Sequence, residues 1–558
     1  MSDALSRFRA HDYPIPEKML AWQLHGAGFE HLGLVGRPEL VDVPRPGRME
    51  VLMRVDAVGL CFSDVKLIRA GNEHPRIRGR DLVADPTRPG HEVSLTLAAV
   101  GDGVDMDAEI GDRFVIQANI RWKGEDVSFG YVIPGGLSQY VLLDERAIAG
   151  DHGNYLIPVS EQVGLVEAAL VEPWSCIEGA NRIPQRTEMK AGGARVVVTI
   201  GGGDAPGGVT DGAGELEVVS SGEIAAYGGA VENLGAAPDD VVIVGRPTGE
   251  LCGIVLDSLA DGGILCLLSC DGVDGRTQVD VGRIHYRDIR IVGSTGADVN
   301  AAYACNARQD TLGGGAALFP GSAGPMGMMH VQRAIEAPRP PRVVVVTDLS
   351  AERLAYAERL LKPVGQARGV EYHSVNPGEM DGAEAFDGKL DELSGGRGYD
   401  DIVVCAPVGA VITGAAKHCA PGCVVNIFAG VPLGTMSEVD LGEVATKSVK
   451  YTGASGSAIE DIVTILDKIA AGKLNTRMSL GTVGGMNQGL EGLEGVSKGR
   501  FYGKCVLFPW IEEMPLATPR EVAGRVDGLG DLLDGGDIWT TAAEEFFVER
   551  MAGRALGT

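Results

Sequence analysis

A set of segments repeated at a constant spacing constrains the fold more than any other feature of this sequence. Residues 239–243 (DDVVI) resemble residues 400–404 (DDIVV), and each run is followed about twenty residues later by a turn and another apolar run. Two later pairs keep the offset of 160 or 161 residues: 279–282 with 439–442, and 291–294 with 451–454. A constant offset over several segments predicts a duplicated α/β half, although generic parallel-sheet texture is the alternative.

The pattern of apolar residues divides the chain into two kinds of structure. After Gly192, runs of β-branched residues such as RVVVVTD alternate with helical stretches, which is typical of a parallel sheet buried on both faces. Between Met19 and Gly150, short apolar runs are separated by Gly, Pro and Asp, which predicts a β-rich domain. Residues 161–181 have helical spacing, and residues 1–16 are predicted to be a polar arm. The predicted class is α/β with a β-rich N-terminal domain.

Length, charge and cysteine content narrow the functional classes. A chain of 558 residues is too long for one hydrophobic core, and its net charge of −27 disfavours nucleic acid as a partner. No apolar run reaches the length of about 18 residues that a membrane span needs, and the first residues have no signal-peptide core. Ten scattered cysteines without a CxxC pair favour reduced thiols and a cytoplasmic protein.

One turn in the second copy has the spacing of a dinucleotide-binding turn. An apolar strand precedes PGSAGPMG at residues 320–327, and a helical pattern follows it. Gly324 and Gly327 match a G-x-G-x-x-G turn, whereas Ser322 replaces its first glycine. Asp348 follows the next strand, where a carboxylate can accept the ribose hydroxyls and favours NAD over NADP. The predicted cofactor-binding residues are Gly321, Ser322, Gly324, Pro325, Met326, Gly327, Asp348 and Arg353.

Two alternatives bear on these glycine turns. The turn at 320–327 could be a plain βαβ turn without a nucleotide, and the nearby Arg353 leaves NADP open. The first copy has GGGDAPGG at residues 201–208, after a strand but before more Gly, Asp and Pro instead of a helix. We interpret the first copy as a degenerate one that binds no dinucleotide.

Three short patches carry residues that could bind a catalytic zinc ion. They are GLCFSDV at 59–65, PGHE at 89–92 and LVEPWS at 170–175, and each alone is more typical of ordinary structure than of a metal site. Together, Cys61, His91 and Glu172 provide a thiolate, an imidazole and a carboxylate, with one coordination position left for water or substrate. Glu92 could be a fourth ligand or exchange with water.

These three patches, in this order before a Rossmann-like half, resemble the zinc-dependent medium-chain dehydrogenases. Within that family they are similar to the sorbitol and threonine dehydrogenase branch, in which Glu replaces the third Cys ligand. Motifs of the second half, such as VNIFAG and YTGASGSAIED, are similar to the L-sorbose-1-phosphate reductase branch. The resemblance implies a GroES-like catalytic domain with zinc and a Rossmann domain with NAD. It also implies that zinc ionises a substrate hydroxyl, that Ser63 passes the proton outward and that Asp64 supports a metal ligand.

The resemblance implies the following organisation. Residues 17–190 form the catalytic domain, 191–305 an inserted degenerate Rossmann-like half, 306–461 the NAD-binding domain, 462–510 the return to the catalytic domain, and 511–558 a helical extension. The segment GKCVL at 503–507 is expected to be a closing strand of the catalytic domain. The stretch that carries a second, structural zinc in relatives has no Cys at residues 120–136, so one zinc ion is expected.

The predicted function is hydride transfer between NAD and the hydroxyl of a polyol, sugar or sugar phosphate, in a homodimer or homotetramer. Lys66, Arg69, Arg121 and Lys123 are candidate phosphate-binding residues by position only. One alternative is a non-catalytic dinucleotide sensor or assembly subunit, and another is a lyase or epimerase that uses NAD transiently. The insert could pack beside the NAD-binding domain, extend or block an oligomer interface, or cover the cleft.

Overall fold

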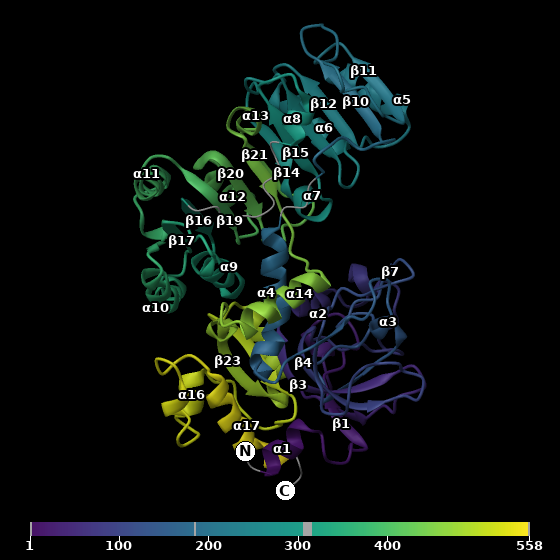
Figure 1. Ribbon diagram of the computed structural model, residues 1–558, viewed down its shortest axis with the longest axis vertical. Coiled ribbons are helices and arrows are strands. Elements are labelled where there is room, and N and C mark those ends of the chain that lie inside the picture. Colours follow the sequence, from purple (N-terminus) through teal and green to yellow (C-terminus); the bar gives the residue numbers. More distant parts are fainter. Residues whose placement is uncertain (1–2, 183–185, 305–314, 556–558) are drawn as a thin grey trace. The chain divides into compact units, whose positions relative to one another are not determined.

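The computed structural model describes residues 3–182, 186–304 and 315–555, which fold into two compact units (Figure 1). Unit 1 comprises Met1–Glu178 and Gly456–Thr558, and unit 2 comprises Gly179–Ser455. The predicted α/β class with a β-rich N-terminal part is confirmed by the sheets of the two units. The predicted boundary at residues 305–306 lies outside the described residues.

Unit 1 is built around one largely antiparallel sheet of seven strands. All ten residues of β3 (Val51–Leu60) are buried, and β3 pairs with β4 (Glu92–Val100). The late strand β24 (Lys504–Phe508) pairs with β3, so residues 503–507 complete the sheet as predicted. The other strands of the sheet are β23 (Leu480–Gly485), β5 (Arg113–Ile116), β9 (Leu156–Pro158) and β8 (Tyr140–Leu143).

The predicted polar arm at residues 1–16 is wrong, because residues 3–9 form helix α1 (Asp3–Arg9). Leu5 and Phe8 are buried on this helix, and the Phe8 ring lies 4.7 Å from the ring of Trp510. The guanidinium of Arg54 stacks 3.8 Å from the centre of the Phe8 ring. Leu5 and Phe8, three positions apart, are too weak a helical pattern in a short polar segment. The residues that Phe8 packs against are distant in sequence, so no local pattern predicts the helix.

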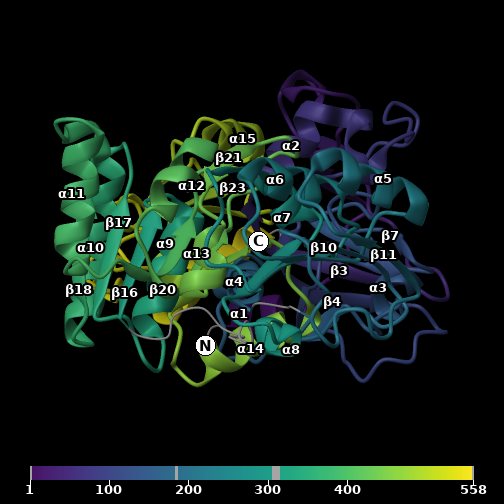
Figure 2. The same ribbon diagram turned by 90° about the horizontal axis from the view of Figure 1, so that it is seen from above.

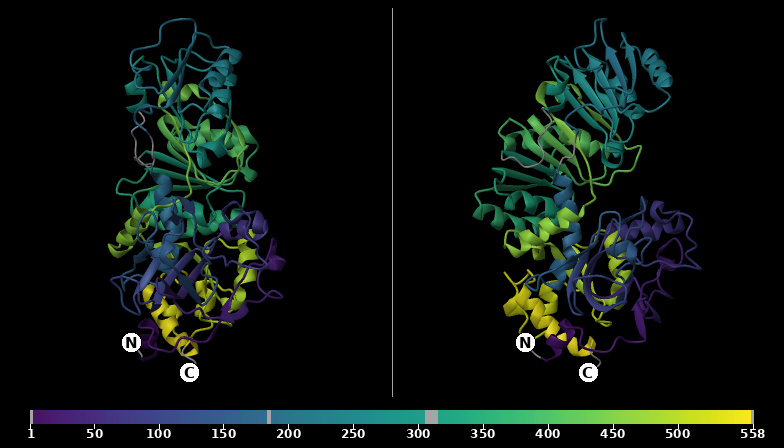
Figure 3. Two further views of the ribbon diagram at one scale, coloured as in Figure 1. Left: turned by 90° about the vertical axis from the view of Figure 1, so that its right-hand side faces the viewer. Right: turned by 45° about the vertical axis from the view of Figure 1, so that its right-hand side comes forward.

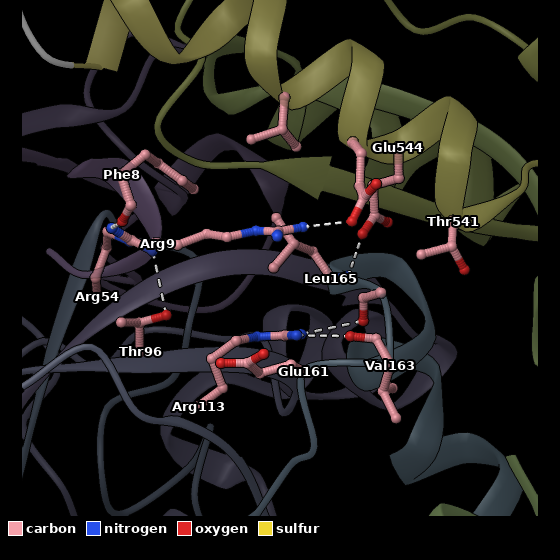
Figure 4. A pocket seen from close by; sticks show the side chains of 13 residues that line it. Phe8, Arg9, Arg54, Thr96, Arg113, Glu161, Val163, Leu165, Thr541 and Glu544 are labelled. Carbon is pink, nitrogen blue, oxygen red and sulfur yellow. Dashed lines mark hydrogen bonds and ion pairs between the residues drawn. The ribbon is translucent and has the colours of Figure 1, made fainter. Parts of the chain in front are cut away.

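Helix α4 (Leu165–Asn181) begins four residues later than the predicted helical segment and carries Glu172. The carboxylate of Glu544 accepts a hydrogen bond from the backbone amide of Leu165, at the start of α4 (Figure 4). It also accepts the backbone amide of Val166 at 2.9 Å. Glu544 belongs to helix α17 (Thr541–Ala555), and the short helix α16 (Pro519–Ala523) precedes it. The extension predicted to be helical therefore contains the short α16 and the longer α17, and α17 caps the helix that carries Glu172.

Unit 2 contains two parallel sheets, which Figure 3 shows as two separate sets of strands. We call residues 194–304 the first lobe and residues 315–455 the second lobe. In the second lobe the strand order is β18-β17-β16-β19-β20-β22, which is the 3-2-1-4-5-6 order of dinucleotide-binding sheets. Its strands are β16 (Ala316–Pro320), β17 (Val343–Thr347), β18 (Glu371–Val375), β19 (Tyr399–Val404), β20 (Cys419–Ile427) and β22 (Lys450–Thr452).

Helices cover the second sheet as expected for parallel strands buried on both faces. Figure 2 shows α10 (Ala351–Ala367) and α11 (Ala383–Ser394) beside β17 and β18. Helix α9 (Pro325–Glu336) follows β16 and packs against β17, and α12 (Gly409–Ala416) packs against β19.

The first lobe repeats this arrangement with the order β11-β10-β12-β13-β15, which confirms the inserted partial Rossmann-like repeat. Between β10 and β11, where the second lobe has α9, the structure describes turns and no helix. The absence of a helix after GGGDAPGG is the sequence feature that indicates a degenerate first copy. Its strands are β10 (Ala194–Thr199), β11 (Glu215–Val219), β12 (Asp240–Val244), β13 (Ile264–Leu268) and β15 (Arg290–Ser294).

The two lobes are joined by a short antiparallel ladder with an internal two-fold relation. Strand β14 (Thr277–Asp280) pairs with β21 (Met436–Val439), with Thr277 opposite Val439 and Val279 opposite Ser437. Because the sequence repeat offsets the copies by 160 residues, exchanging the copies turns the first of these pairs into the second. The centre of the ladder is Gln278 opposite Glu438. The lobes therefore meet as two equivalent halves do in a symmetric, isologous interface.

Two further properties of the described residues bear on the predicted cellular setting. None of the described helices is long and apolar enough to cross a membrane. Among the described residues, no two cysteines form a disulfide bond.

Candidate functional site

The candidate metal centre of unit 1 starts where β3 ends. Cys61 follows β3 and stands at the N-terminal cap of α2 (Phe62–Ala70). Three residues later, Asp64 reaches back, and its carboxylate accepts the backbone amide of Cys61 at 3.0 Å. The same carboxylate accepts the amide of Gly90 at 2.9 Å, next to His91. Asp64 therefore ties the Cys61 segment to the His91 segment.

Cys61, His91 and Glu92 bring a sulfur, an imidazole nitrogen and a carboxylate oxygen within 4.8 Å of one another, and among the described residues no other group of this kind occurs. The Nδ1 of His91 lies 3.1 Å from the Asp64 carboxylate, which leaves Nε2 as the ring nitrogen available to a metal. Burial disfavours the charged forms of both residues, but their mutual attraction raises the pKa of His91 and lowers that of Asp64.

Glu92 is fully buried and shares its environment with Lys504. The Nζ of Lys504 donates to Oε1 of Glu92 at 2.5 Å, and burial, which lowers the pKa of this amine, is outweighed by the Glu92 charge, which raises it. Oε2 of Glu92 is buried and has no hydrogen-bond partner. A Cβ at Gly59 would lie 2.2 Å from that oxygen, so only glycine leaves room for it. An orphaned buried carboxylate oxygen next to Cys and His fits a missing cation.

Glu172 lies close enough to this group for electrostatic interaction, although it is outside the set within 4.8 Å. Burial is the main cause that raises the pKa of Glu172, the charge of Glu92 adds to it, and His91 and Lys504 oppose it. The thiol of Cys176, one helical turn later, donates to Oε1 of Glu172 at 3.5 Å. The structure therefore gathers all four predicted ligands around one region.

Two side chains beside this site were not among the four candidates that position alone suggested. Lys66, Arg69, Arg121 and Lys123 are exposed. His74 and Arg76 instead pack on Tyr131, with the His74 ring 5.2 Å and the Arg76 guanidinium 4.7 Å from its ring centre.

Tyr131 in turn lies 6.1 Å from the His91 ring, between centroids. Burial, together with the charges of Arg76 and Lys66, lowers the pKa of His74 to about 4. A cluster of basic groups therefore lies one aromatic ring away from the candidate ligand His91. Ser63, the predicted proton carrier, is half-buried on α2.

The candidate dinucleotide site of unit 2 is the turn between β16 and α9. A Cβ at Gly327 would lie 2.4 Å from Ser322, so this glycine is required for close packing of the helix on the turn. Gly324 is the N-cap of α9 and has no side-chain cap, and the nearest atom to a Cβ there would be Nη1 of Arg353 at 4.0 Å. Open space at an uncapped helix start beside an arginine suits a phosphate. Pro325 and Met326 form the first turn of α9.

The remaining predicted cofactor residues have distinct positions. Gly321 has a φ of +67° and makes the sharp turn after β16. Ser322 is buried, and its hydroxyl donates to the carbonyl of Pro320, so its backbone alone is left to meet a ligand. Asp348 follows β17, is half-buried, and accepts the amide of Ser350 at 3.0 Å through one carboxylate oxygen. Among the described residues, the other carboxylate oxygen of Asp348 accepts no hydrogen bond.

Sequence reasoning missed Lys504, Cys176, His74 and Arg76. Lys504 had a signal, because a lysine at the start of a strand as apolar as KCVLF needs a charged partner when buried. Its partner Glu92 is 412 residues away, which no local pattern reveals. His74 and Arg76 lie in a short 3-10 segment without periodicity.

Comparisons with known proteins agree with this arrangement. Residues 47–150 match the alcohol dehydrogenase GroES-like domain. Mannitol-1-phosphate 5-dehydrogenase of Aliivibrio fischeri is 27% identical over 450 residues, which cover 80% of this chain and 77% of that protein. L-sorbose 1-phosphate reductase of Klebsiella pneumoniae is 24% identical over 523 residues, which cover 92% of this chain and 94% of that protein.

A solved structure shares the fold. The 2R,3R-butanediol dehydrogenase of Bacillus subtilis aligns with a TM-score of 0.52 at 16% identity, covering 88% of this chain and 99% of that one. The GroES-like match, the two long sequence relatives and the strand order of the second lobe agree with one another. The chain belongs to the medium-chain dehydrogenase/reductase family and is an oxidoreductase.

Proposed function

We propose that this protein is a zinc-dependent dehydrogenase that transfers a hydride between NAD and a hydroxyl group of a polyol, sugar or sugar phosphate. The observation that carries the proposal is the group of half-buried Cys61 with buried His91 and Glu92, in which Oε2 of Glu92 has no hydrogen-bond partner. A dinucleotide sensor or an assembly subunit has no need of such a group. We infer a cytoplasmic setting from the scattered cysteines, which form no disulfide bond among the described residues.

Cys61, His91 and a carboxylate from Glu172 or Glu92 would hold the zinc ion. Zinc held there would lower the pKa of a hydroxyl that it polarises, as it lowers the pKa of bound water to roughly 7. Asp64 accepts the Nδ1 proton of His91 and thereby orients the ring. Lys504 holds one oxygen of Glu92 and leaves the other free to approach the metal.

The remaining roles belong to side chains that bind or move protons. Ser63, two residues after Cys61, would carry the hydroxyl proton of the substrate away from the centre. The start of α9 would bind the pyrophosphate through backbone amides. Asp348 would accept the two adenosine ribose hydroxyls, and its negative charge disfavours the 2′-phosphate of NADP.

A phosphate on the substrate is favoured by two observations. The two long relatives are named for phosphorylated substrates, mannitol 1-phosphate and L-sorbose 1-phosphate. In a chain with a net charge of −27, the cations Lys66 and Arg76 lie beside His74, close to the candidate metal ligands. Arg76 is the member best suited to the phosphate, because a guanidinium binds two oxygens at once.

Elemental mass spectrometry of the wild type and of Cys61→Ser tests the metal centre. We expect one zinc ion per wild-type chain and its loss in the variant, with unchanged circular dichroism. A folded wild type without zinc would overturn the mechanism and favour the sensor alternative. A screen of polyols and their phosphates with NAD then separates a dehydrogenase from a lyase or epimerase, because the latter produces no net NADH.

A further inference from the structure

A residue of the first lobe reaches the strand ends of the second lobe. Helix α7 (Val281–Tyr286) of the first lobe carries His285, which is 8% exposed. Its Nδ1 donates to the carbonyl of Ile427 at 2.9 Å, and its Nε2 lies 3.1 Å from the hydroxyl of Ser455. Ile427 ends β20, and Ser455 follows β22 by three residues. His285 therefore bridges the carboxyl ends of two neighbouring parallel strands.

The hydrogen bonds fix the roles of the ring nitrogens. A carbonyl oxygen only accepts, so Nδ1 of His285 must carry the proton that is donated to Ile427. In the neutral ring, Nε2 then accepts the hydroxyl proton of Ser455. The hydroxyl oxygen of Ser455 keeps lone pairs that face away from His285 and can accept a proton from an amide group.

The internal repeat supplies a comparison within the same chain. His285 lies over Gly453, whose Cβ would be 3.3 Å from the Cα of His285. The equivalent glycine of the first lobe, Gly293, lies under Ala445 of the second lobe, with a Cβ-to-Cα distance of 3.1 Å. Each lobe thus places one helix on the strand end of the other. The second lobe, which has the predicted phosphate turn, is contacted by a polar His. The degenerate first lobe is contacted by an apolar Ala.

The strand ends that His285 bridges lie in the second half of the dinucleotide sheet. In sheets of this order, the dinucleotide lies along the carboxyl ends, with adenosine at the first three strands and the other nucleotide at the last three. Asp348 follows β17 in the first half, whereas β20 and β22 are in the second half. The backbone near Ile427 and the hydroxyl of Ser455 are therefore expected beside the nicotinamide.

We propose that His285, supplied by the first lobe, is a positioning residue of the nicotinamide half of the site, where it fixes the Ile427 carbonyl and the Ser455 hydroxyl. The first lobe, which lacks its own phosphate turn, then contributes to the cofactor site of the second lobe. This inference rests on the dinucleotide binding proposed above. The ligand that it concerns is the nicotinamide carboxamide, whose amide protons need acceptors.

Binding measurements on the full-length protein test this inference. The dissociation constants of NADH, by fluorescence, and of ADP-ribose, by calorimetry, are compared for the wild type, His285→Ala, His285→Asn and Ser455→Ala. Loss of hydrogen bonds worth about 1.4 kcal/mol weakens binding about tenfold. We expect this tenfold loss for NADH in His285→Ala and Ser455→Ala, and a twofold change at most for ADP-ribose, which lacks the nicotinamide.

The other variants make the outcomes distinct. His285→Asn keeps the bond to Ile427 and should recover part of the NADH affinity. His373→Ala, a half-exposed histidine on β18, is the matched control and should bind both ligands as the wild type does. The inference is wrong if His285→Ala binds NADH as tightly as the wild type does. It is also wrong if both His285 variants lose as much affinity for ADP-ribose as they lose for NADH. A wild type that binds neither ligand overturns the proposed function instead.

Discussion

Replacement of Asp56 by Asn should strongly destabilise unit 1, because it leaves a buried arginine without its counter-ion. Arg54 is 3% exposed, and its Nε donates to Asp56 at 2.7 Å. Asp56 is fully buried and also accepts the Thr96 hydroxyl at 2.6 Å. Burial disfavours the charge of Arg54, but Asp56 and Tyr13 together raise its pKa. The ion pair is therefore formed at neutral pH.

The expected magnitude follows from the burial of both partners. Breaking a buried ion pair by removing one charge costs about 3–5 kcal/mol. Arg54 keeps its bonds to the Phe8 carbonyl and the Tyr13 hydroxyl, which places Asp56→Asn near the lower limit of that range. Replacing both charges by apolar residues, as in Arg54→Met with Asp56→Leu, is expected to restore most of the stability. Asp42→Asn breaks a pair whose carboxylate is 82% exposed and should cost under about 1 kcal/mol.

Urea unfolding followed by tryptophan fluorescence measures this effect selectively. All five tryptophans are in unit 1, and Trp510 donates to the carbonyl of Asp56 at 2.8 Å. With a slope of about 3 kcal/mol/M, a loss of about 3 kcal/mol lowers the midpoint by about 1 M. A midpoint for Asp56→Asn equal to that of Asp42→Asn would refute the reasoning, since it would mean that Arg54 needs no counter-ion.

Four further predictions concern other parts of the chain. Glu544→Ala leaves two buried amides of α4 without an acceptor and should cost about 2–4 kcal/mol in the same assay, against under about 1 kcal/mol for the half-exposed Glu545→Ala. Burial and Arg333 lower the pKa of His330 to about 3, so the unfolded chain binds a proton below about pH 6.5 that the folded chain does not bind. His330 should therefore reduce stability by about 2–3 kcal/mol between pH 7 and 4.5, and His330→Gln should make the total fall smaller by that amount in thermal unfolding followed by circular dichroism, while the buried His74 keeps its own contribution. Asp348→Ser should raise the affinity for NADPH relative to NADH by at least about tenfold, measured by fluorescence. Arg76→Ala should raise the KM for a phosphorylated polyol about 10–100-fold, with little change for the unphosphorylated polyol, in steady-state assays.

The sequence allowed the fold class and the repeat to be predicted because both depend on strand burial. A strand covered on both faces, such as RVVVV before Asp348, needs apolar residues at every position, and this pattern is visible without knowledge of its neighbours. The candidate ligands could be predicted for a similar reason. Cys61 and His91 lie in short motifs whose glycines and Asp64 set the local backbone, so each motif is recognisable on its own.

The partners of those ligands could not be predicted, because they come from distant segments. The bond of Lys504 to Glu92 and the cap that Glu544 places on α4 join residues hundreds of positions apart, and each partner lies in an otherwise ordinary strand or helix. The helix α1 was missed for the same reason. Its apolar residue Phe8 packs against Trp510 and Arg54, which are distant in sequence, so the local pattern around Leu5 and Phe8 does not reveal the helix.

The first lobe retains only some of the features of a dinucleotide-binding half. The described residues after β10 form turns, so this lobe lacks the helix N-terminus that binds a pyrophosphate in such sheets. Its strands β12, β13 and β15 remain buried, and its ladder with β21 keeps the two-fold register of the repeat. What this lobe retains is therefore the part that contacts the other lobe. We therefore expect this half to act on a bound cofactor only through that interface, where His285 of α7 contacts the strand ends of the second lobe.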